Sequence, residues 1–410
     1  MTLKGNTIKK FNFRSLFSGM QPLFVLAHFG HHLLTALPIP LLPMIRSDFA
    51  LDYTQSGLVI SALALPSGIS QLPGGWLADR IGPRILITIG ISGVALAGLL
   101  VGLSQTYIMM IVFLVLMGMM SGGYHPASAP LISASVEPKN RGRALGFHMI
   151  GGSASHFIAP LIAASIAIVW GWRGSFIALA VPTIVFGIVF YVLLGQRADT
   201  KQNKPRITVS DNHTPPTPRR SRRLVPFIIL ATFTGAMITS TISFIPLFLV
   251  DHFGVGKETA AALIAVIYSA GFWAAPLGGY LSDRWGRVPV MLTACFIAGP
   301  VIFLLNLVPY GLGIGAVLLA IGMIIFTRAP ATQAYIIDQT SERNRSTILG
   351  IFFFGNQEGA GVLTPVMGYL IDQLGFYLSF TIAGAALVIV TLVCSIWLWG
   401  CMGRGGFRNG

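Results

Sequence analysis

Ionisable side chains inside long apolar segments are the residues of this sequence that could do chemistry. The 410-residue chain is 54% hydrophobic and only 10% charged. Polar and charged groups are costly inside a membrane, where they mark binding sites and ion pathways. In the first half of the chain these groups are His28, His31, His32, His125, His148 and His156. In the second half they are Arg328 and Glu358, with Asn356 and Gln357 beside the glutamate.

Three interpretations of the histidines are open. They could be metal ligands, because the i, i+4 spacing of His28 and His32 places both rings on one helix face and His125 could complete a site. No carboxylate or cysteine lies at comparable depth in this half, so we rank metal transport third and assign no metal ligands. They could exchange protons, because histidine titrates near physiological pH. We favour neutral hydrogen-bonding groups that line an aqueous cavity, with His148 the least expected to contact substrate.

Arg328 and Glu358 lie at comparable depth, counted from the ends of their apolar segments. This predicts that the two side chains are close enough to interact. They could form a structural ion pair, or an arginine that binds substrate with a titratable glutamate as its counter-ion. Glu358 or His125 would then carry the coupling proton. Neither a nucleophile–base spacing nor a phosphate loop stands out, so we expect no enzyme, no catalytic residue and no cofactor.

Twelve apolar segments long enough to cross a bilayer position these side chains. They are 18–45, 54–78, 85–104, 107–135, 143–169, 173–195, 224–250, 258–281, 288–308, 311–338, 346–371 and 375–399. With the N-terminus in the cytoplasm, 23 of the 27 Lys and Arg fall on the cytoplasmic side, which supports this count. The net charge of +14 reflects that bias rather than nucleic-acid binding. The only long polar stretch predicts a linker at 196–223, between six-helix bundles at 1–195 and 224–410.

Two copies of a charged motif, called here the hinge motifs, support a duplication. They read GGWLADRIGPR at 74–84 and GGYLSDRWGR at 278–287, and their aspartates are 204 positions apart. The same offset relates Arg141 to Arg345 and Pro126 to Pro330. Glycines at a membrane helix end allow close helix approach, and the aspartate can face the positive N-terminus of another helix. The expected gating residues are Gly75, Asp79, Arg80, Arg84, Arg141, Gly279, Asp283, Arg284, Arg287 and Arg345.

The hinge motifs resemble the loop 2–3 signature of the major facilitator superfamily, and the resemblance covers essentially the whole chain. It implies an all-α integral membrane fold of twelve transmembrane helices in two pseudo-symmetric six-helix bundles. It also implies that the first, fourth, seventh and tenth spans line a central site. The lining residues implied in this way are His28, His31, His32, Tyr124, His125, Thr239, Ser243 and Arg328. Asp79 would face the start of the eleventh span, near Arg345, and Asp283 the start of the fifth, near Arg141.

Gly122-Gly123-Tyr124-His125-Pro126 and the stretch from Gly151 to Pro160 resemble the branch that includes fosmidomycin-resistance exporters. The second piece looks like a worn antiporter motif in which His156 and Ala159 replace glycines. Two departures concern proton coupling. The arginine that drug–proton antiporters usually carry early in the fourth span is absent from 111–117, and His31-His32 stands where the first span often has an acid. Glu358 or a histidine would have to serve instead.

The sequence therefore predicts a multi-pass secondary transporter of a cytoplasmic membrane, with both termini in the cytoplasm, working as a monomer by alternating access. We expect proton-coupled export of a small organic compound, amphipathic or anionic. Uptake of an organic anion, metal or metal-chelate transport, and a non-transporting receptor or assembly factor are the alternatives.

Overall fold

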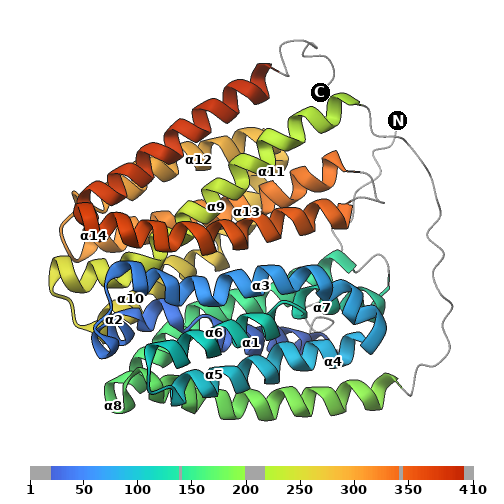
Figure 1. Cartoon of the computed structure of the whole chain (residues 1–410). Coiled ribbons are helices and arrows are strands. Elements are labelled where there is room, and N and C mark those ends of the chain that lie inside the picture. Colours follow the sequence, from blue (N-terminus) through green and yellow to red (C-terminus); the bar gives the residue numbers. More distant parts are fainter. Residues whose placement is uncertain (1–19, 138–140, 199–217, 341–344, 401–410) are drawn as a thin grey trace, which may run out of the picture.

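The structure is a computed structural model that describes residues 20–137, 141–198, 218–340 and 345–400 (Figure 1). Every regular element within these ranges is a helix. In chain order they are α1 Gln21–Thr35, α2 Pro38–Phe49, α3 Tyr53–Ile81, α4 Pro83–Thr88, the π-helix η2 Ile89–Gly93, α5 Val94–Leu103, α6 Tyr107–Ser121, α7 Tyr124–Ser135, α8 Arg141–Ala198, α9 Pro218–Phe253, α10 Lys257–Ser269, the 3-10 helix η5 Ala270–Phe272, α11 Ala274–Trp285, α12 Arg287–Leu304, α13 Leu312–Gln339 and α14 Arg345–Gly400.

Capping residues and glycines set the helix ends. The Asp52 carboxylate accepts from the backbone N–H of Gln55 at 2.6 Å, and the Gln55 side chain accepts from the N–H of Asp52 at 3.2 Å. This reciprocal capping box fixes the start of α3. Gly82 after α3 and Gly286 after α11 have φ of 88° and 94°, which glycine adopts at little steric cost. The chain can therefore turn sharply within each hinge motif.

Ten stretches of helix among the described residues are long and apolar enough to cross a membrane. Two of them, Ala144–Gln196 and Ile348–Leu398, hold 53 and 51 residues, more than twice what one crossing needs. Each is interrupted at a glycine with positive φ, Gly171 in α8 and Gly375 in α14. Counting each of these long helices as two crossings gives twelve, the number that the sequence predicts.

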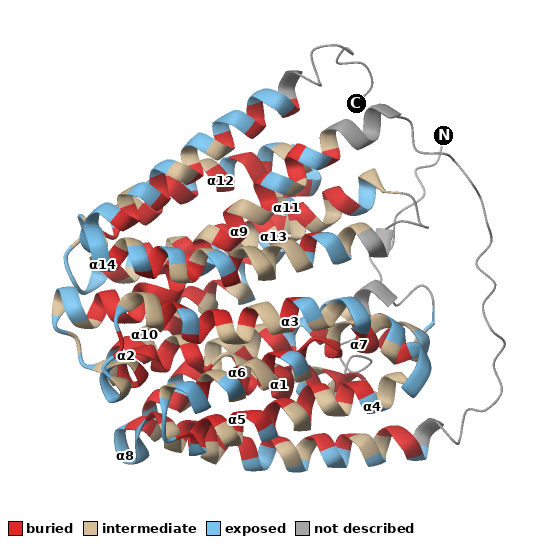
Figure 2. Cartoon of the chain, in the orientation of Figure 1, coloured by how far each residue is buried: buried red, intermediate tan, exposed pale blue. Residues whose placement is uncertain are grey.

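Large apolar side chains cover the outer surface. Ile168 and Ile396 are 71% and 70% exposed. Figure 2 shows exposed positions along the outer helices, while buried positions face other helices. Soluble monomers rarely expose extended apolar surface of this kind, whereas lipid accepts it. The chain is an all-helical integral membrane protein, as predicted.

The predicted duplication agrees with the helix boundaries. Adding 204 to the bounds of α3, Tyr53–Ile81, gives 257–285, where α10 begins and α11 ends. The same offset relates Gly82 to Gly286 and Gly171 to Gly375, and all four have positive φ. It also relates Ala50 to Gly254, with φ of 51° and 66°. The two halves therefore repeat in backbone conformation as well as in motif.

Figure 1 shows the helices of the first half in one layer and those of the second half in another, with α3 beside α14. The predicted linker at 196–223 is too long at both ends, because α8 continues to Ala198 and α9 already begins at Pro218. Helical backbone at 218–223 includes the arginines that the prediction assigned to the linker. Residues 199–217 lie outside the described part of the chain. The division into bundles at 1–195 and 224–410 stays a prediction.

Candidate functional site

Six histidines of the first half gather around Tyr124. The imidazole of His31 stacks on the Tyr124 ring at 4.1 Å between centroids, and His28 stacks on His148 at 4.2 Å. The His32 ring lies between these groups, 4.6 Å from His31 and 4.8 Å from His156. Residues from α1, α7 and α8 therefore meet in one aromatic cluster, called here the histidine cluster: His28, His31, His32, Tyr124, His125, His148 and His156.

Backbone carbonyls orient four of the rings. The Nδ1 atoms of His28 and His148 lie 2.9 Å from the carbonyl oxygens of His148 and Phe24. The Nδ1 of His31 is 2.6 Å from the Gly90 oxygen, and that of His156 is 2.9 Å from the Gly152 oxygen. A carbonyl only accepts, so each Nδ1 must carry the hydrogen and each neutral ring keeps a lone pair on Nε2.

Glycines in α8 make this arrangement possible. A Cβ on Gly152 would lie 2.8 Å from Nε2 of His28, and a Cβ on Gly151 would meet the Val25 carbonyl. Small residues let two membrane helices approach in this way. The stretch that resembles an antiporter motif thus has a packing role against α1, which weakens it as an indication of antiport.

Arg328 is buried in the second half. Its side chain is on α13, and Nη1 donates to the Ala231 carbonyl of α9 at 2.8 Å. Its Nε atom is buried without a hydrogen-bond partner. Gly235 of α9 borders the guanidinium, since a Cβ there would lie 3.0 Å from Nη2, and the same Cβ would meet Oδ1 of Asn356. Arg328 and Asn356 therefore both border Gly235, although the sequence did not pair these two residues.

Glu358 lies elsewhere, and the predicted interaction with Arg328 is wrong for this conformation. Its Oε1 is buried without a hydrogen-bond partner and lies against Gly68 of α3, where a Cβ would collide with it. Gln357 is close to the same glycine, with its Cβ 3.3 Å from that position. The α14 face that carries Glu358 points to α3 instead of to α13.

Glu358 marks the end of a closely packed stretch between α3 and α14. The Ser61 hydroxyl donates to the Gly361 carbonyl at 2.5 Å. A Cβ on Gly57 would lie 2.7 Å from the Pro365 Cα. Beyond Glu358, Gly350 has no neighbour within 4 Å of a Cβ. The two halves are thus in contact from Tyr53 to Gly68 along α3.

Ion pairs and hydrogen bonds join the halves at one end of the molecule, called here the closed end. Arg46 pairs with Asp251 at 2.8 Å, and the Tyr53 hydroxyl donates to the same carboxylate at 2.7 Å. The Asp372 carboxylate accepts from the backbone N–H groups of Tyr53 and Thr54 at 2.9 and 2.8 Å. An anion at a helix N-terminus is stabilising. Sequence analysis missed these acids; their positions beside apolar segments, at the same predicted membrane face as Arg46, could have indicated them.

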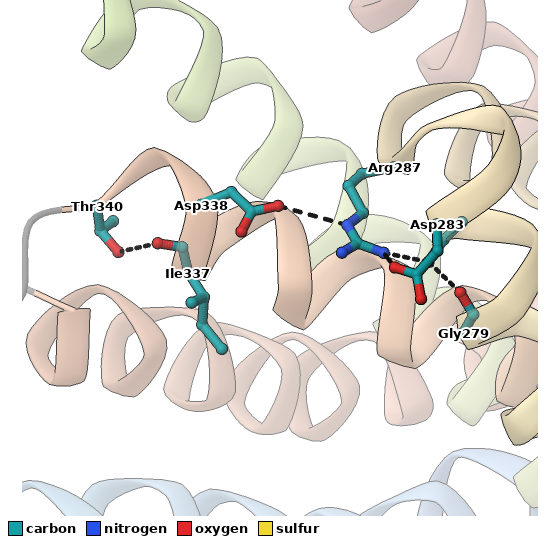
Figure 3. Close-up of polar contacts among 7 residues, drawn as sticks. Gly279, Asp283, Arg287, Ile337, Asp338 and Thr340 are labelled. Atoms are coloured by element: carbon teal, nitrogen blue, oxygen red, sulfur yellow. Dashed lines mark hydrogen bonds and ion pairs between the residues drawn. The ribbon is translucent and has the colours of Figure 1, made fainter. Parts of the chain in front are cut away.

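The opposite end, called here the hinge end, carries the hinge motifs, and there the described arginines contact their own halves. Figure 3 shows Arg287 between Asp283 and Asp338, with 3.4 Å separating Nε from the second carboxylate. Arg84 donates from Nε to the Tyr191 carbonyl at 2.7 Å. Arg80 lies 4.2 Å over the Trp76 ring, and Arg284 donates to the Tyr280 hydroxyl at 3.3 Å.

Within the described part of the chain no ion pair joins Asp79 or Asp283 to the other half, and their predicted contacts with the starts of the fifth and eleventh spans stay predictions. The side chains of Arg141 and Arg345 lie outside the described part. Gly75 and Gly279 have nothing within 4 Å of a Cβ. The close approaches involve Gly74, next to Gly123, and Gly278, next to Thr327, and so differ by one residue from the prediction.

Two residues of α9, Thr239 and Ser243, were predicted to line the central site. Ser243 is buried and donates to the Thr239 carbonyl of its own helix at 2.9 Å, and Thr239 is exposed. Neither joins the groups around Arg328 in this conformation.

Two repeated helical halves, joined by these contacts at the closed end, form the architecture of a transporter built from internal repeats. The profile of the Major Facilitator Superfamily matches residues 24–328 and 261–401, and the chain belongs to this family. It is a multi-pass membrane transporter of small molecules and not an enzyme.

Relatives share this architecture over most of their length. The chain is 23% identical to the hexuronate transporter of Bacillus subtilis (strain 168), over 85% of this chain and 87% of the relative. It is 28% identical to the probable sulfoacetate transporter SauU of Cupriavidus necator, with 85% and 86% covered. It is 26% identical to the multidrug resistance protein MdtG of Citrobacter koseri, with 85% of both covered.

Solved structures agree with the fold. A bacterial homolog of the human lysosomal transporter Spinster, inward-facing and unoccupied, matches with a TM-score of 0.70 at 17% identity, covering 93% of this chain and 95% of the other. A POT family transporter in complex with 5-aminolevulinic acid matches with a TM-score of 0.77 at 13% identity, covering 93% and 96%.

Proposed function

We propose that this protein is a proton-coupled transporter of a small organic anion. The observation that carries the proposal is Arg328, a buried cation with an unpartnered Nε and no acid paired with it among the described residues. An uncompensated buried charge is expensive, and a carboxylate or sulfonate supplies both the missing charge and the missing acceptor. Asn356 adds an amide oxygen for a hydroxyl on the same substrate.

Glu358 is the proposed proton carrier. Its buried, unpartnered Oε1 favours the protonated carboxyl, because burial without a partner penalises the charged form. It sits where α3 and α14 separate, so a movement of the halves would change its access to water. Loss of the proton would then be tied to the conformational change. His125, the other predicted carrier, belongs to the first half and lacks a comparable interface position.

The contacts at the closed end and the hinge end indicate which transport state the structure represents. With the predicted topology, in which both termini are cytoplasmic in a cytoplasmic membrane, the hinge end faces the cytoplasm and the closed end faces outward. The conformation is then inward-facing. The contacts that join the halves at the closed end lie within one chain, which supports a monomeric unit.

Export of an amphipathic compound is the second candidate, and the likeness to MdtG over 85% of both chains favours it. The hexuronate and sulfoacetate relatives favour the organic anion instead, and the packing role of Gly151 and Gly152 weakens one indication of antiport. We therefore place the anion first and leave export as the predicted direction.

Ligand-induced thermal stabilisation of the purified protein tests the substrate class. Ligands that bind the folded state raise the melting temperature by mass action. We expect sugar acids or small sulfonates to stabilise the native protein and to lose this effect in Arg328→Met, while neutral and cationic compounds do not stabilise either. Stabilisation by cationic amphiphiles alone, unchanged in Arg328→Met, would favour drug export and reject the anion site.

A further inference from the structure

We propose that His28, His32 and His125 form a binding site for a divalent transition-metal ion of the Zn²⁺, Co²⁺ or Ni²⁺ class. One potential ligand atom from each ring lies within 4.8 Å of the others. The proposal does not depend on the organic anion or on Arg328, which belongs to the second half. It concerns the one group of described histidines whose nitrogens converge in this way.

The protonation pattern of His28 suits a metal ligand. Its Nδ1 is held by the His148 carbonyl at 2.9 Å, so the lone pair is on Nε2. That Nε2 is buried and has no hydrogen-bond partner. A ring that donates one N–H to a backbone carbonyl and directs the other nitrogen to a metal is the usual arrangement of a metal-bound histidine. The His148 carbonyl thus provides the outer support that such a ligand needs.

The other two rings lie close enough to His28 to complete the site. His32 follows His28 by one helical turn on α1 and lies 4.9 Å away between ring centroids. Its Nδ1 has only a long contact of 3.4 Å with Thr35, and the His125 ring makes no hydrogen bond to a described residue. His125 lies 5.3 Å from His28 and 5.4 Å from His32. Both rings are therefore free to turn toward a shared ion.

The distances require a modest contraction. Zn–N bonds of about 2.0–2.1 Å in a tetrahedral site put ligand nitrogens roughly 3.3 Å apart. Side-chain rotation of His32 and His125 can supply the difference from 4.8 Å, because neither ring is tied to a carbonyl. His125 is the most accessible of the three, so it provides the route by which an ion would enter.

The donor set selects the metal. Three neutral imidazoles suit Zn²⁺, Co²⁺, Ni²⁺ or Cu²⁺, whereas Ca²⁺ and Mg²⁺ require oxygen ligands that this cluster lacks. Three protein ligands leave a fourth position for water, hydroxide or an anion. An anionic fourth ligand would also reduce the charge that the ion brings into the membrane.

Cobalt binding to the full chain, purified through a histidine-free tag, tests the site. Tetrahedral Co²⁺ gives strong visible absorption, which we expect to saturate at one ion per chain and to be displaced by Zn²⁺. His32→Gln and His125→Gln should each lower the affinity about tenfold or more, because each removes a ligand. His252→Gln is the matched control, since His252 is an exposed histidine outside the cluster and should change nothing.

A second measurement uses the unmutated protein, so that a variant that fails to fold cannot obscure the result. Zn²⁺ should protect His32 and His125 from diethylpyrocarbonate, read residue by residue by mass spectrometry, and leave His252 reactive. Absorption typical of octahedral Co²⁺ with equal affinity in all variants, or no protection by Zn²⁺, would overturn the proposal.

Discussion

Tyr124 and Arg328 occupy equivalent positions in the two halves, 204 residues apart, and each is buried against the first helix of its half. Tyr124 stacks on His31 of α1 at 4.1 Å, while Arg328 donates to the Ala231 carbonyl of α9. The residue equivalent to His31 is Gly235, which leaves room for the guanidinium. One half thus uses this position for a neutral aromatic cluster, and the other uses it for a cation.

Gly235→Ala should weaken anion binding, because the added methyl group would crowd Arg328 and Asn356. The added Cβ would lie 3.0 Å from Nη2 of Arg328 and would collide with Oδ1 of Asn356. Both groups must shift, and we expect about a tenfold loss of affinity, equivalent to ~1.4 kcal/mol. Gly350→Ala is the matched control, because Gly350 has no neighbour within 4 Å. Titration calorimetry measures the anion affinity of both variants. Equal affinities would show that Gly235 does not contribute to the anion site.

Glu358→Gln should uncouple transport from protons. The amide is close in size to the carboxyl but cannot lose a proton, so exchange of substrate across a vesicle membrane should continue while accumulation driven by a pH gradient is lost. Glu258→Gln, at the start of α10 near the closed end, is the control and should still accumulate substrate. Normal proton-driven accumulation by Glu358→Gln would assign the proton to another group.

Asp251→Asn should loosen the closed end. The carboxylate accepts from both Arg46 and the Tyr53 hydroxyl. The Arg46 and Asp251 side chains are 27% and 28% exposed, so solvent screens the pair and its contribution is about 0.2–1 kcal/mol. A shift of this size changes the ratio of the two transport states by up to about fivefold. Spin labels on the two halves would detect it as a distance change at the closed end.

Asp48→Asn is the matched control for that experiment. Asp48 pairs with Arg173 at 2.5 Å, but both residues belong to the first half. Removing this pair should lower stability slightly and leave the distance between the halves unchanged. A distance change of equal size in both variants would mean that general loosening, and not a gate, was measured.

Gly152→Ala should destabilise the protein. The added Cβ would lie 2.8 Å from Nε2 and 2.7 Å from Cε1 of His28, and overpacking of this kind costs about 1–3 kcal/mol. Gly75→Ala is the control, since it adds a methyl group to a helix with nothing within 4 Å. Alanine favours helix over glycine, so the control should be neutral or slightly stabilising. Thermal unfolding of both variants without ligand decides the comparison.

The sequence alone predicts the helices well, for a physical reason. Each crossing needs about 20 apolar residues, and glycines such as Gly171 and Gly375 end a crossing at a turn. The offset of 204 then relates one half to the other at single-residue accuracy, as Gly82 and Gly286 illustrate. The family follows from the same motifs.

Side-chain neighbours across helices were harder to predict. Counting residues along a span does not give the rotation of α13 and α14 about their axes, and so the expected proximity of Arg328 and Glu358 was wrong. The Arg46–Asp251 contact depends in addition on which end of the transporter is closed, and a single sequence does not specify one state. The grouping of the histidines was easier to predict from the sequence, because His28, His31 and His32 already share one helix.

Asp79→Asn tests the hinge motif through the state that this structure does not show. In the present conformation Asp79 has no ion pair among the described residues, so the substitution should leave the stability of this state almost unchanged. If Asp79 faces the N-terminus of α14 when the hinge end closes, loss of its charge removes up to about 1 kcal/mol from that state alone. Transport should slow severalfold while substrate affinity measured in this state stays the same. A loss of affinity without slower cycling would show that Asp79 acts on the binding site and would contradict the hinge role.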